Sequence, residues 1–216
     1  MLDLFGEELT ETRRKNRDYI GSRLSVVKTI GASNHSLTER QPEEYYATPP
    51  YAVEKLLELE TFSHNILEPS CGGGHVSRVL EGHGHNVISI DLYDRGYGIP
   101  GIDFLNQKEC ARVFEEPLDC DIVGNPPYKY AQEFVERGLE VVGDGHKCAW
   151  FLKLTFLEGK ARRTLFDRCC LEKVYVSSSR LGCGKNGTEW NPSAVCYAWF
   201  IWKKGFQGDP IIKWFN

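Results

Sequence analysis

The stretch HNILEPSCGGGHVSRVL, residues 64–80, contains a short apolar strand, a turn with three consecutive glycines and the start of a helix. The strand is predicted over residues 64–68, and Val76, Val79 and Leu80 have helical spacing. Consecutive glycines let the backbone turn sharply and let a ligand approach it closely. A strand that passes through such a turn into a helix is the building unit of an α/β fold.

The same alternation continues along the chain. Apolar segments predict further strands at 86–91, 102–105, 120–123, 147–156, 173–178 and 194–203, with 211–215 as an additional edge candidate. Helical spacing predicts helices at 51–59, 107–114, 131–139 and 159–169. Strands that alternate with helices favour a doubly wound sheet, whereas the last strands have only the loop 179–193 between them. We therefore predict an α/β fold with a mostly parallel, seven-stranded sheet and an antiparallel edge hairpin.

The composition is that of a soluble globular protein. Of 216 residues, 41% are hydrophobic and 26% charged, and the net charge of −4 provides no global basic field. No apolar run approaches the ~20 residues of a membrane span, and the N-terminus lacks the pattern of a signal peptide. We expect a cytoplasmic protein without membrane contact. Residues 1–44 are predicted as a polar extension and 45–216 as a single domain.

The eight cysteines do not suggest a metal site. None forms a C-x-x-C pair, and most lie in or beside apolar segments. Reduced thiols that pack as small hydrophobic groups fit this pattern. We predict no bound metal.

Acidic and small residues follow the predicted strands where each one ends, and ligands of such sheets bind at these ends. Glu68 and the glycines follow the first strand. Asp91 stands 23 residues after Glu68 at the end of the second strand, which suits the two hydroxyls of a ribose. Asp103 and Phe104 come next, an acid for an exocyclic amine and a ring for a base. This ordered set predicts an adenosine site, although the glycine turn is neither a G-x-G-x-x-G fingerprint nor a P-loop.

The segment DIVGNPPY, residues 121–128, ends another strand in an amide, two prolines and an aromatic ring. Prolines cannot donate to a sheet ladder, and each restricts the residue before it. The prolines therefore fix the backbone, and Asn125 and Tyr128 are the groups that it presents. This pattern predicts a site rather than an ordinary turn.

In their order, LEPSCGGG, Asp91, Asp103-Phe104 and NPPY resemble the S-adenosylmethionine-dependent methyltransferases that act on exocyclic amines. The segment Tyr46-Ala-Thr-Pro49 is similar to one found before the first strand in many adenine-N6 DNA methyltransferases. The resemblance covers residues 45–204, and the chain resembles compact phage- or prophage-type members. It departs from the large restriction–modification enzymes because no segment is long enough for a separate target-recognition domain.

The resemblance implies S-adenosyl-L-methionine as the cofactor and methyl transfer to the N6 amine of adenine in DNA. The implied cofactor-binding residues are Tyr46, Thr48, Pro49, Glu68, Pro69, Ser70, Gly72, Gly74, Asp91, Asp103, Phe104 and Asn125. The cofactor already activates the methyl group, so the reaction needs no nucleophilic side chain.

The resemblance also implies that Asn125, Pro126, Pro127 and Tyr128 are catalytic. An adenine amine is a poor nucleophile because its lone pair is delocalised into the ring. The Asn125 side-chain oxygen and the Pro126 carbonyl can accept the two amino hydrogens and favour a pyramidal nitrogen. Pro127 fixes the path of the chain. Tyr128 stacks on the base once it has left a duplex.

The loop 179–193 is glycine-rich and includes Arg180, Lys185 and Trp190, which suit phosphate contact and base stacking. We predict substrate contacts there. Two alternatives stay open, because NPPY also occurs in methyltransferases of RNA base amines and of glutamine amides in proteins. A third alternative is an inactive module that binds cofactor or nucleic acid without turnover.

Overall fold

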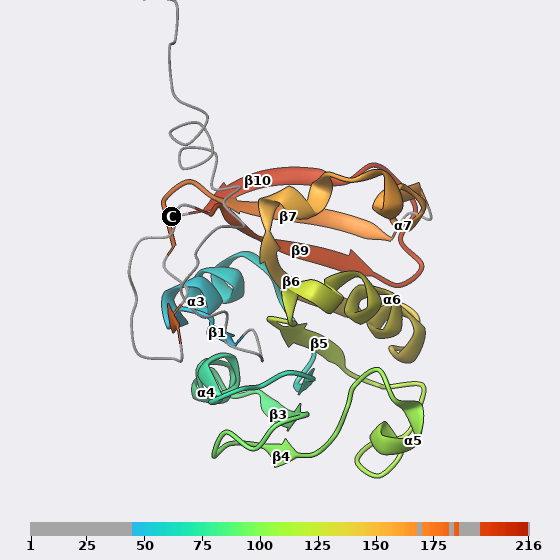
Figure 1. Cartoon of the computed structure of the whole chain (residues 1–216). Coiled ribbons are helices and arrows are strands. Elements are labelled where there is room, and N and C mark those ends of the chain that lie inside the picture. The colour runs from blue at the N-terminus through green and yellow to red at the C-terminus, as the bar shows by residue number, and fades with distance from the viewer. Residues whose placement is uncertain (1–44, 168–169, 182–183, 186–194, 216) are drawn as a thin grey trace, which may run out of the picture. The chain divides into compact units, whose positions relative to one another are not determined.

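The described residues form an α/β structure around one large sheet (Figure 1). The computed structural model describes residues 45–167, 170–181, 184–185 and 195–215. The strands of this sheet stand in the order β10-β7-β9-β6-β5-β2-β3-β4. Their bounds are β2 (Asn65–Glu68), β3 (Asn86–Asp91), β4 (Ile99–Pro100), β5 (Asp121–Gly124), β6 (Lys147–Lys153), β7 (Leu171–Ser177), β9 (Tyr197–Lys203) and β10 (Ile211–Phe215). Neighbouring strands pair in parallel except at β9, which is antiparallel to β6 and β7.

This topology confirms the predicted mostly parallel α/β sheet and corrects its strand count. The sheet has eight strands rather than seven, because Ile211–Phe215 is a strand. β7 and β9 pair antiparallel, as the predicted hairpin requires. β10 then pairs in parallel with β7 and becomes the outermost strand, so the hairpin lies one strand in from the edge.

Residues 102–105 form a turn, and the prediction of a strand there was wrong. Asp103 Oδ1 accepts a hydrogen bond from the Leu105 amide at 2.9 Å, and the Asp103 amide donates to Glu109 Oε2 at 2.8 Å. Such local side-chain bonds favour turns over ladder pairing. The strand next to β3 is instead β4, at Ile99–Pro100. Ile102 and Phe104 in the turn are buried and Leu105 is partly buried, which explains why the segment resembled a strand.

Helices cover both faces of the sheet (Figure 1). They are α3 (Pro50–Leu59), α4 (His75–Gly82), α5 (Gln107–Cys110), α6 (Ala131–Val141) and α7 (Arg163–Asp167), with 3₁₀ helices η1 (Tyr128–Tyr130), η2 (Leu154–Leu157) and η3 (Lys160–Arg162). α3 and α4 pack together on one face, and α5, α6 and α7 contribute to the core on the other. Helices on both faces confirm the doubly wound arrangement.

Three predicted elements are shorter than their apolar patterns. The helix predicted over 107–114 ends at Cys110. The strand predicted over 147–156 ends at Lys153 and continues as η2. The helix predicted over 159–169 is divided between η3 and α7, and residues 168–169 lie outside the described part of the chain.

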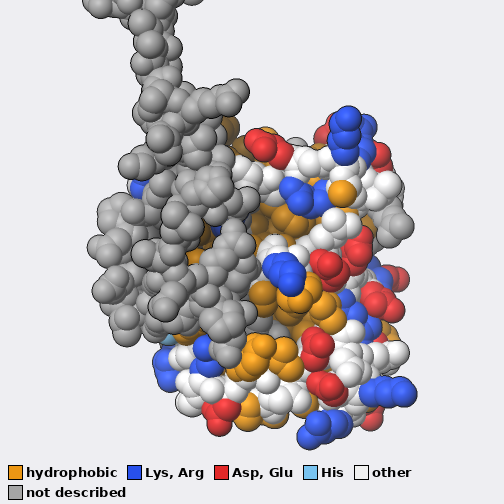
Figure 2. Space-filling model, viewed as in Figure 1, with side chains coloured by type: hydrophobic (Ala, Val, Ile, Leu, Met, Phe, Trp, Pro, Cys, Tyr) orange, Lys and Arg blue, Asp and Glu red, His pale blue; other side chains and the backbone are white. Residues whose placement is uncertain are grey.

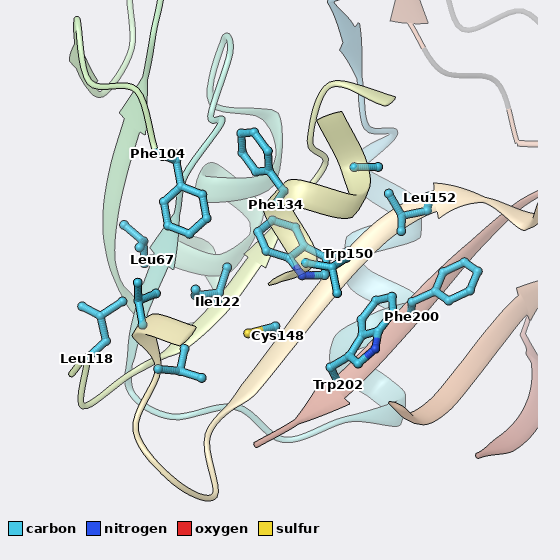
Figure 3. Close-up of a cluster of buried hydrophobic side chains, with 14 of the residues drawn as sticks. Leu67, Phe104, Leu118, Ile122, Phe134, Cys148, Trp150, Leu152, Phe200 and Trp202 are labelled. Carbon is cyan, nitrogen blue, oxygen red and sulfur yellow. The ribbon is translucent and has the colours of Figure 1, made fainter. Parts of the chain in front are cut away.

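β9 contributes to the core on both faces of the sheet. Phe200 and Trp202 belong to the cluster under α6, whereas Trp199 and Ile201 belong to the cluster under α3 and α4. All four side chains are fully buried. Figure 3 shows the first cluster, in which Trp202 lies beside the Phe200 ring. A strand that is apolar on both faces is typical of the centre of an α/β sheet.

The amino ends of the central strands are joined by charged side chains. Glu60, directly after α3, accepts hydrogen bonds from Lys147 on β6 at 2.7 Å and from Lys173 on β7 at 2.6 Å. The Tyr175 hydroxyl also donates to Glu60. Asp121, at the start of β5, accepts hydrogen bonds from the amides of Ser63 and Lys147, both at 2.7 Å. These contacts hold β5, β6 and β7 together at the end of the sheet away from the predicted site.

Among the described residues, no helix has the length and apolar character needed to span a bilayer. In the same part of the chain, no group of three or more His, Cys, Asp or Glu side chains could hold a metal ion. Cys71, Cys110, Cys120 and Cys148 are buried free thiols. The predicted polar extension, residues 1–44, lies outside the described residues.

Candidate active site

A cavity of about 420 Å³ lies at the carboxyl ends of β2, β3 and β5. It is lined by most of the residues predicted from the sequence, namely Tyr46, Thr48, Glu68, Pro69, Ser70, Asp91, Asp103, Phe104, Asn125, Pro126, Pro127 and Tyr128. The fold therefore brings the acidic residues and NPPY to one cavity. Pro49, Gly72 and Gly74 do not line it; Pro49 precedes the first turn of α3.

Asp91 is a fixed acceptor at the end of β3. Its side chain is 8% exposed, its Oδ2 accepts a hydrogen bond from the Gly72 amide at 2.8 Å, and its Oδ1 accepts one from the Tyr93 amide at 2.8 Å. A carboxylate has about four acceptor positions, so about two remain for a ligand. The carboxylate can therefore accept two hydroxyl groups without losing its own support.

Glu68 lies deeper in the cavity and is 1% exposed. Its Oε2 accepts hydrogen bonds from the amide of Ser77, at 2.9 Å, and from the Ser77 hydroxyl, which also contacts the Ser89 hydroxyl at 2.6 Å. Burial raises the pKa of Glu68 to about 8, although the hydrogen bonds from Ser77 oppose this shift. The carboxyl group is thus largely protonated near neutral pH.

The close approach that the glycine turn permits is made by two tyrosine rings of the protein itself, Tyr45 and Tyr97. Gly72 and Gly74 have φ of 53° and 76°, values that favour glycine. A Cβ atom on Gly72 would lie 2.2 Å from the Tyr45 ring, and one on Gly74 would lie 2.5 Å from the Tyr97 ring. The Tyr45 hydroxyl also accepts a hydrogen bond from the Gly73 amide at 2.9 Å. These glycines shape the cavity wall by admitting the two rings.

Phe104 is more deeply buried than its predicted role suggests. It is 1% exposed, and its ring centroid lies 5.3 Å from that of Phe134 and 6.4 Å from that of Trp150 (Figure 3). It reaches the cavity from the core side. Leu92, directly after Asp91, is 49% exposed and lines the same cavity. Leu92 therefore offers apolar surface for a base, although it was not among the residues predicted from the sequence.

The Asn125 amide is held in one orientation. Its Nδ2 donates to the Tyr46 carbonyl at 2.8 Å, and the Ser70 hydroxyl donates to the Asn125 carbonyl at 3.1 Å. The Asn125 Oδ1 is buried and has no hydrogen-bond partner among the described residues. A buried acceptor without a partner costs about 1–3 kcal/mol. An acceptor left in this way beside a cavity indicates a ligand donor as its partner.

Tyr128 is surrounded by aromatic rings and a cation. Its centroid lies 5.9 Å from that of Tyr46, with an angle of 22° between the ring planes, and 6.0 Å from that of Tyr197. Lys153 Nζ lies over the Tyr128 ring at 4.6 Å from its centroid. Tyr46 thus contacts both parts of NPPY, the amide through its carbonyl and the tyrosine through its ring.

The predicted substrate loop is joined to the site by a short antiparallel ladder. β1 (Tyr46–Ala47) pairs with β8 (Gly184–Lys185), with Tyr46 opposite Lys185. The loop backbone therefore reaches the residue that supports Asn125. Arg180 Nη1 lies 3.2 Å from Cys196 Sγ. Trp190 lies outside the described residues, so its predicted role is untested.

Several residues of the site were not identified from the sequence. Tyr45, Leu92 and Arg95 line the cavity, and the Arg95 guanidinium lies 4.5 Å from the Tyr45 ring centroid. Two of them could have been predicted: Tyr45 directly precedes the segment Tyr46–Pro49, and Leu92 directly follows Asp91. Lys153 had no such signal, because its contact depends on where the Tyr128 ring lies.

No family model and no curated protein matches the sequence. Solved structures do match the fold. A modification subunit assigned to a type I restriction enzyme from Vibrio vulnificus aligns with 81% of this chain at 11% identity and a TM-score of 0.58, and the chain spans 48% of its length. A class I S-adenosylmethionine-dependent methyltransferase assigned in Listeria monocytogenes aligns with 82% at 12% identity and a TM-score of 0.51, over 68% of that protein.

A protein from Pyrococcus horikoshii, assigned as an RNA methyltransferase, aligns with 84% of this chain and 99% of its own at 13% identity and a TM-score of 0.54. These likenesses establish the fold. The chain has the Rossmann-like fold of these methyltransferases, and it spans about half the length of the modification subunit.

Proposed function

We propose that this chain is an S-adenosylmethionine-dependent methyltransferase that modifies the exocyclic N6 amine of adenine in DNA. The observation that carries the proposal is the Asn125 amide. Its nitrogen is committed to the Tyr46 carbonyl, and its buried oxygen has no partner in the described part of the chain. An amine has hydrogens to donate, so the geometry at Asn125 favours an amine as the reacting group.

The cavity residues fit the proposed cofactor. Asp91 has acceptor positions for the two ribose hydroxyls, and Asp103 has a carboxylate for the adenine amine. Leu92 and Phe104 provide apolar surface for the purine. Thr48 Oγ1 is a second buried polar atom without a partner among the described residues, in the segment Tyr46–Pro49. S-adenosylmethionine, when bound, supplies a methyl group activated by a sulfonium.

The chain's own residues then prepare the amine. Asn125 Oδ1 and the Pro126 carbonyl accept its two hydrogens, which keeps the nitrogen lone pair out of the ring system. Pro127 holds the backbone in place, and Tyr128 supports the base. Because these acceptors are positioned before the substrate arrives, little reorganisation is needed in the transition state.

Adenine in DNA is the favoured substrate because of the Tyr46–Pro49 segment, which resembles that of adenine-N6 DNA methyltransferases. The segment is also structurally part of the site, since Tyr46 supports Asn125 and contacts Tyr128. The shared fold does not choose between nucleic acids, because the similar structures include both a modification subunit and a protein assigned as an RNA methyltransferase.

The test uses radiolabelled S-adenosylmethionine with separate DNA, RNA and protein pools, followed by nucleoside and amino-acid analysis. We expect label in N6-methyladenine from DNA. Asn125→Ala should then lower the single-turnover rate about a hundred- to a thousandfold, the usual cost of one preorganised hydrogen bond. Asn86→Ala is the control, since Asn86 is exposed at the opposite end of the sheet.

Label in RNA or protein alone would overturn the proposed substrate. A near-parental rate for Asn125→Ala, with normal thermal unfolding, would remove the amide from the mechanism. Loss of activity that only accompanied unfolding of the variant would assign Asn125 to a structural turn.

A further inference from the structure

Lys153 is the last residue of β6, the strand that pairs with β5. NPPY follows β5 directly, so Lys153 and Tyr128 approach one another beyond the carboxyl ends of neighbouring strands. The Lys153 ammonium lies over the Tyr128 ring at 4.6 Å from the centroid. A cation therefore stands beside the ring that is proposed to support the target base.

The charge of Lys153 is not balanced by a carboxylate within the described residues. At the other end of the same strand, Lys147 forms an ion pair with Glu60 at 2.7 Å, and Lys173 forms one with the same carboxylate. Lys204 donates to backbone carbonyls. Lys153 is half-buried and has a ring as its described partner. The lysines cited at the amino end of the sheet thus share a carboxylate partner, whereas this cation at the carboxyl end is available to an anion.

Two further cations belong to segments that border Lys153 or Tyr128. The Leu154 amide donates to the Cys196 carbonyl at 2.8 Å, and the Arg180 guanidinium contacts the thiol of the same Cys196 at 3.2 Å. Lys129 directly follows Tyr128 and is exposed. Lys153 is thus the basic side chain seen against the Tyr128 ring, and Arg180 and Lys129 stand on neighbouring segments of a protein of net charge −4. Figure 2 shows that basic and acidic side chains are interspersed on the described part of the face in view.

We propose that Lys153 binds a backbone phosphate next to the target base, which makes it a substrate-binding residue of the nucleic-acid strand. The inference rests on the proposed nucleic-acid substrate. A nucleotide that stacks on Tyr128 brings phosphates on the 5′ and 3′ sides of its sugar, and Lys153 Nζ lies over that ring at 4.6 Å from its centroid. Lysine suits this contact because it is a compact charge on a flexible stem. The alternative substrate, a glutamine side chain in a protein, has no backbone phosphate for Lys153 to bind.

The experiment measures binding of a fluorescein-labelled mixed-sequence oligonucleotide, as single strand and as duplex, by anisotropy over a range of NaCl concentrations. Lys153→Gln should weaken binding about tenfold at low salt, as expected for one hydrogen bond to a charged group. It should also reduce the slope of log K against log salt by about 0.7 for the single strand and about 0.9 for the duplex. Lys153→Arg should restore the slope because it retains the charge.

Lys213→Gln is the matched control, because Lys213 is exposed on the edge strand β10, three strands away from β6. It should bind like the parent. Lys153→Met keeps the alkyl stem and provides a second neutral variant if Lys153→Gln does not fold. Thermal unfolding of each variant is measured alongside.

Each outcome decides the proposal. A salt slope for folded neutral variants equal to that of Lys213→Gln would overturn the phosphate contact, and lost affinity with an unchanged slope would do the same. In either case, methylation of DNA by the parent would leave the proposed function standing. A parent that labels protein and neither binds nor methylates DNA would overturn both.

Discussion

Burial of the Glu68 side chain changes the charge of the cavity. Its carboxyl group is held by Ser77 at 1% exposure, and burial raises its pKa to about 8. The formal net charge includes Glu68 as an anion, but near neutral pH its carboxyl group is largely neutral in the folded protein. A cationic ligand in the cavity would favour the ionised form, so its binding would release a proton from Glu68.

The raised pKa of Glu68 leads to a prediction about stability and pH. The folded pKa lies above the unfolded value of 4.5, so its contribution to stability is full below that value and is lost as pH rises through about 8. Glu68→Gln cannot lose this contribution. Relative to the parent, the variant should therefore gain on the order of 1 kcal/mol of unfolding free energy per pH unit between about pH 5 and pH 8.

Urea unfolding over this pH range measures the difference. Glu133→Gln, at an exposed position on α6, is the control and should show a constant difference from the parent. A constant difference for Glu68→Gln as well would mean that Glu68 is already ionised in the folded protein.

At the level of elements, β9 places two buried tryptophans on opposite faces with different polar environments. Trp199 Nε1 donates to the Ala52 carbonyl in α3 at 2.8 Å. Trp202 Nε1 is buried without a hydrogen-bond partner among the described residues. Both side chains are fully buried, so truncation of either removes similar volume. The hydrogen bond from Trp199 therefore fastens α3 to the sheet.

Trp199→Phe should destabilise the protein more than Trp202→Phe. Both variants lose packing, but only Trp199→Phe also loses a side-chain hydrogen bond, the one to the Ala52 carbonyl. Trp202→Phe instead removes a buried N–H that has no partner among the described residues. The difference in unfolding free energy should be about 1–3 kcal/mol. Urea denaturation with matched m-values measures it. Equal losses would show that the hydrogen bond from Trp199 adds nothing measurable to stability.

The elements also show how far the sequence analysis reached. β5 and β6 were predictable because buried strands read as continuous apolar runs. The turn at 102–105 was mistaken for a strand, since Ile102 and Phe104 are buried and the deciding bonds come from Asp103 and Glu109. That the acidic residues and NPPY line one cavity was predictable because parallel strands end together. Lys153 was not, because its partner comes from another strand.

Across the whole sheet, the two ends have different charge arrangements. The amino end contains Glu60 with Lys147 and Lys173, and the carboxyl end contains the candidate site. Burial raises the pKa of Glu60, but hydrogen bonds from the two lysines and Tyr175 outweigh it, and the net pKa is lowered. Because this group lies away from the cavity, its loss should affect folding and leave cofactor binding unchanged.

Glu60→Gln should lower the unfolding free energy by about 1–3 kcal/mol at neutral pH, because two lysines lose their anion. A lowered folded pKa contributes stability above the unfolded value of 4.5 and loses it as pH falls through the folded value. The cost of the substitution should therefore shrink in acid. Glu58→Gln, which breaks an exposed pair with Lys55, should cost little at any pH.

Urea unfolding at neutral and acidic pH, with calorimetry of S-adenosylmethionine binding, measures both expectations. A cost for Glu60→Gln that does not change with pH would mean that the carboxylate contributes through packing. A change in cofactor affinity would show that the two ends of the sheet are coupled.

The hydrogen bond between the Asn125 amide and the Tyr46 carbonyl has a consequence for sequence evolution. The acceptor is a main-chain carbonyl, which every amino acid carries. Codon changes at position 46 can remove the ring beside Tyr128 but cannot remove the oxygen that orients the Asn125 amide. Insertions or deletions between Tyr45 and Pro49 would displace that oxygen. Lineages of this protein should therefore tolerate drift in the identity of residue 46 far more readily than drift in the length of its segment.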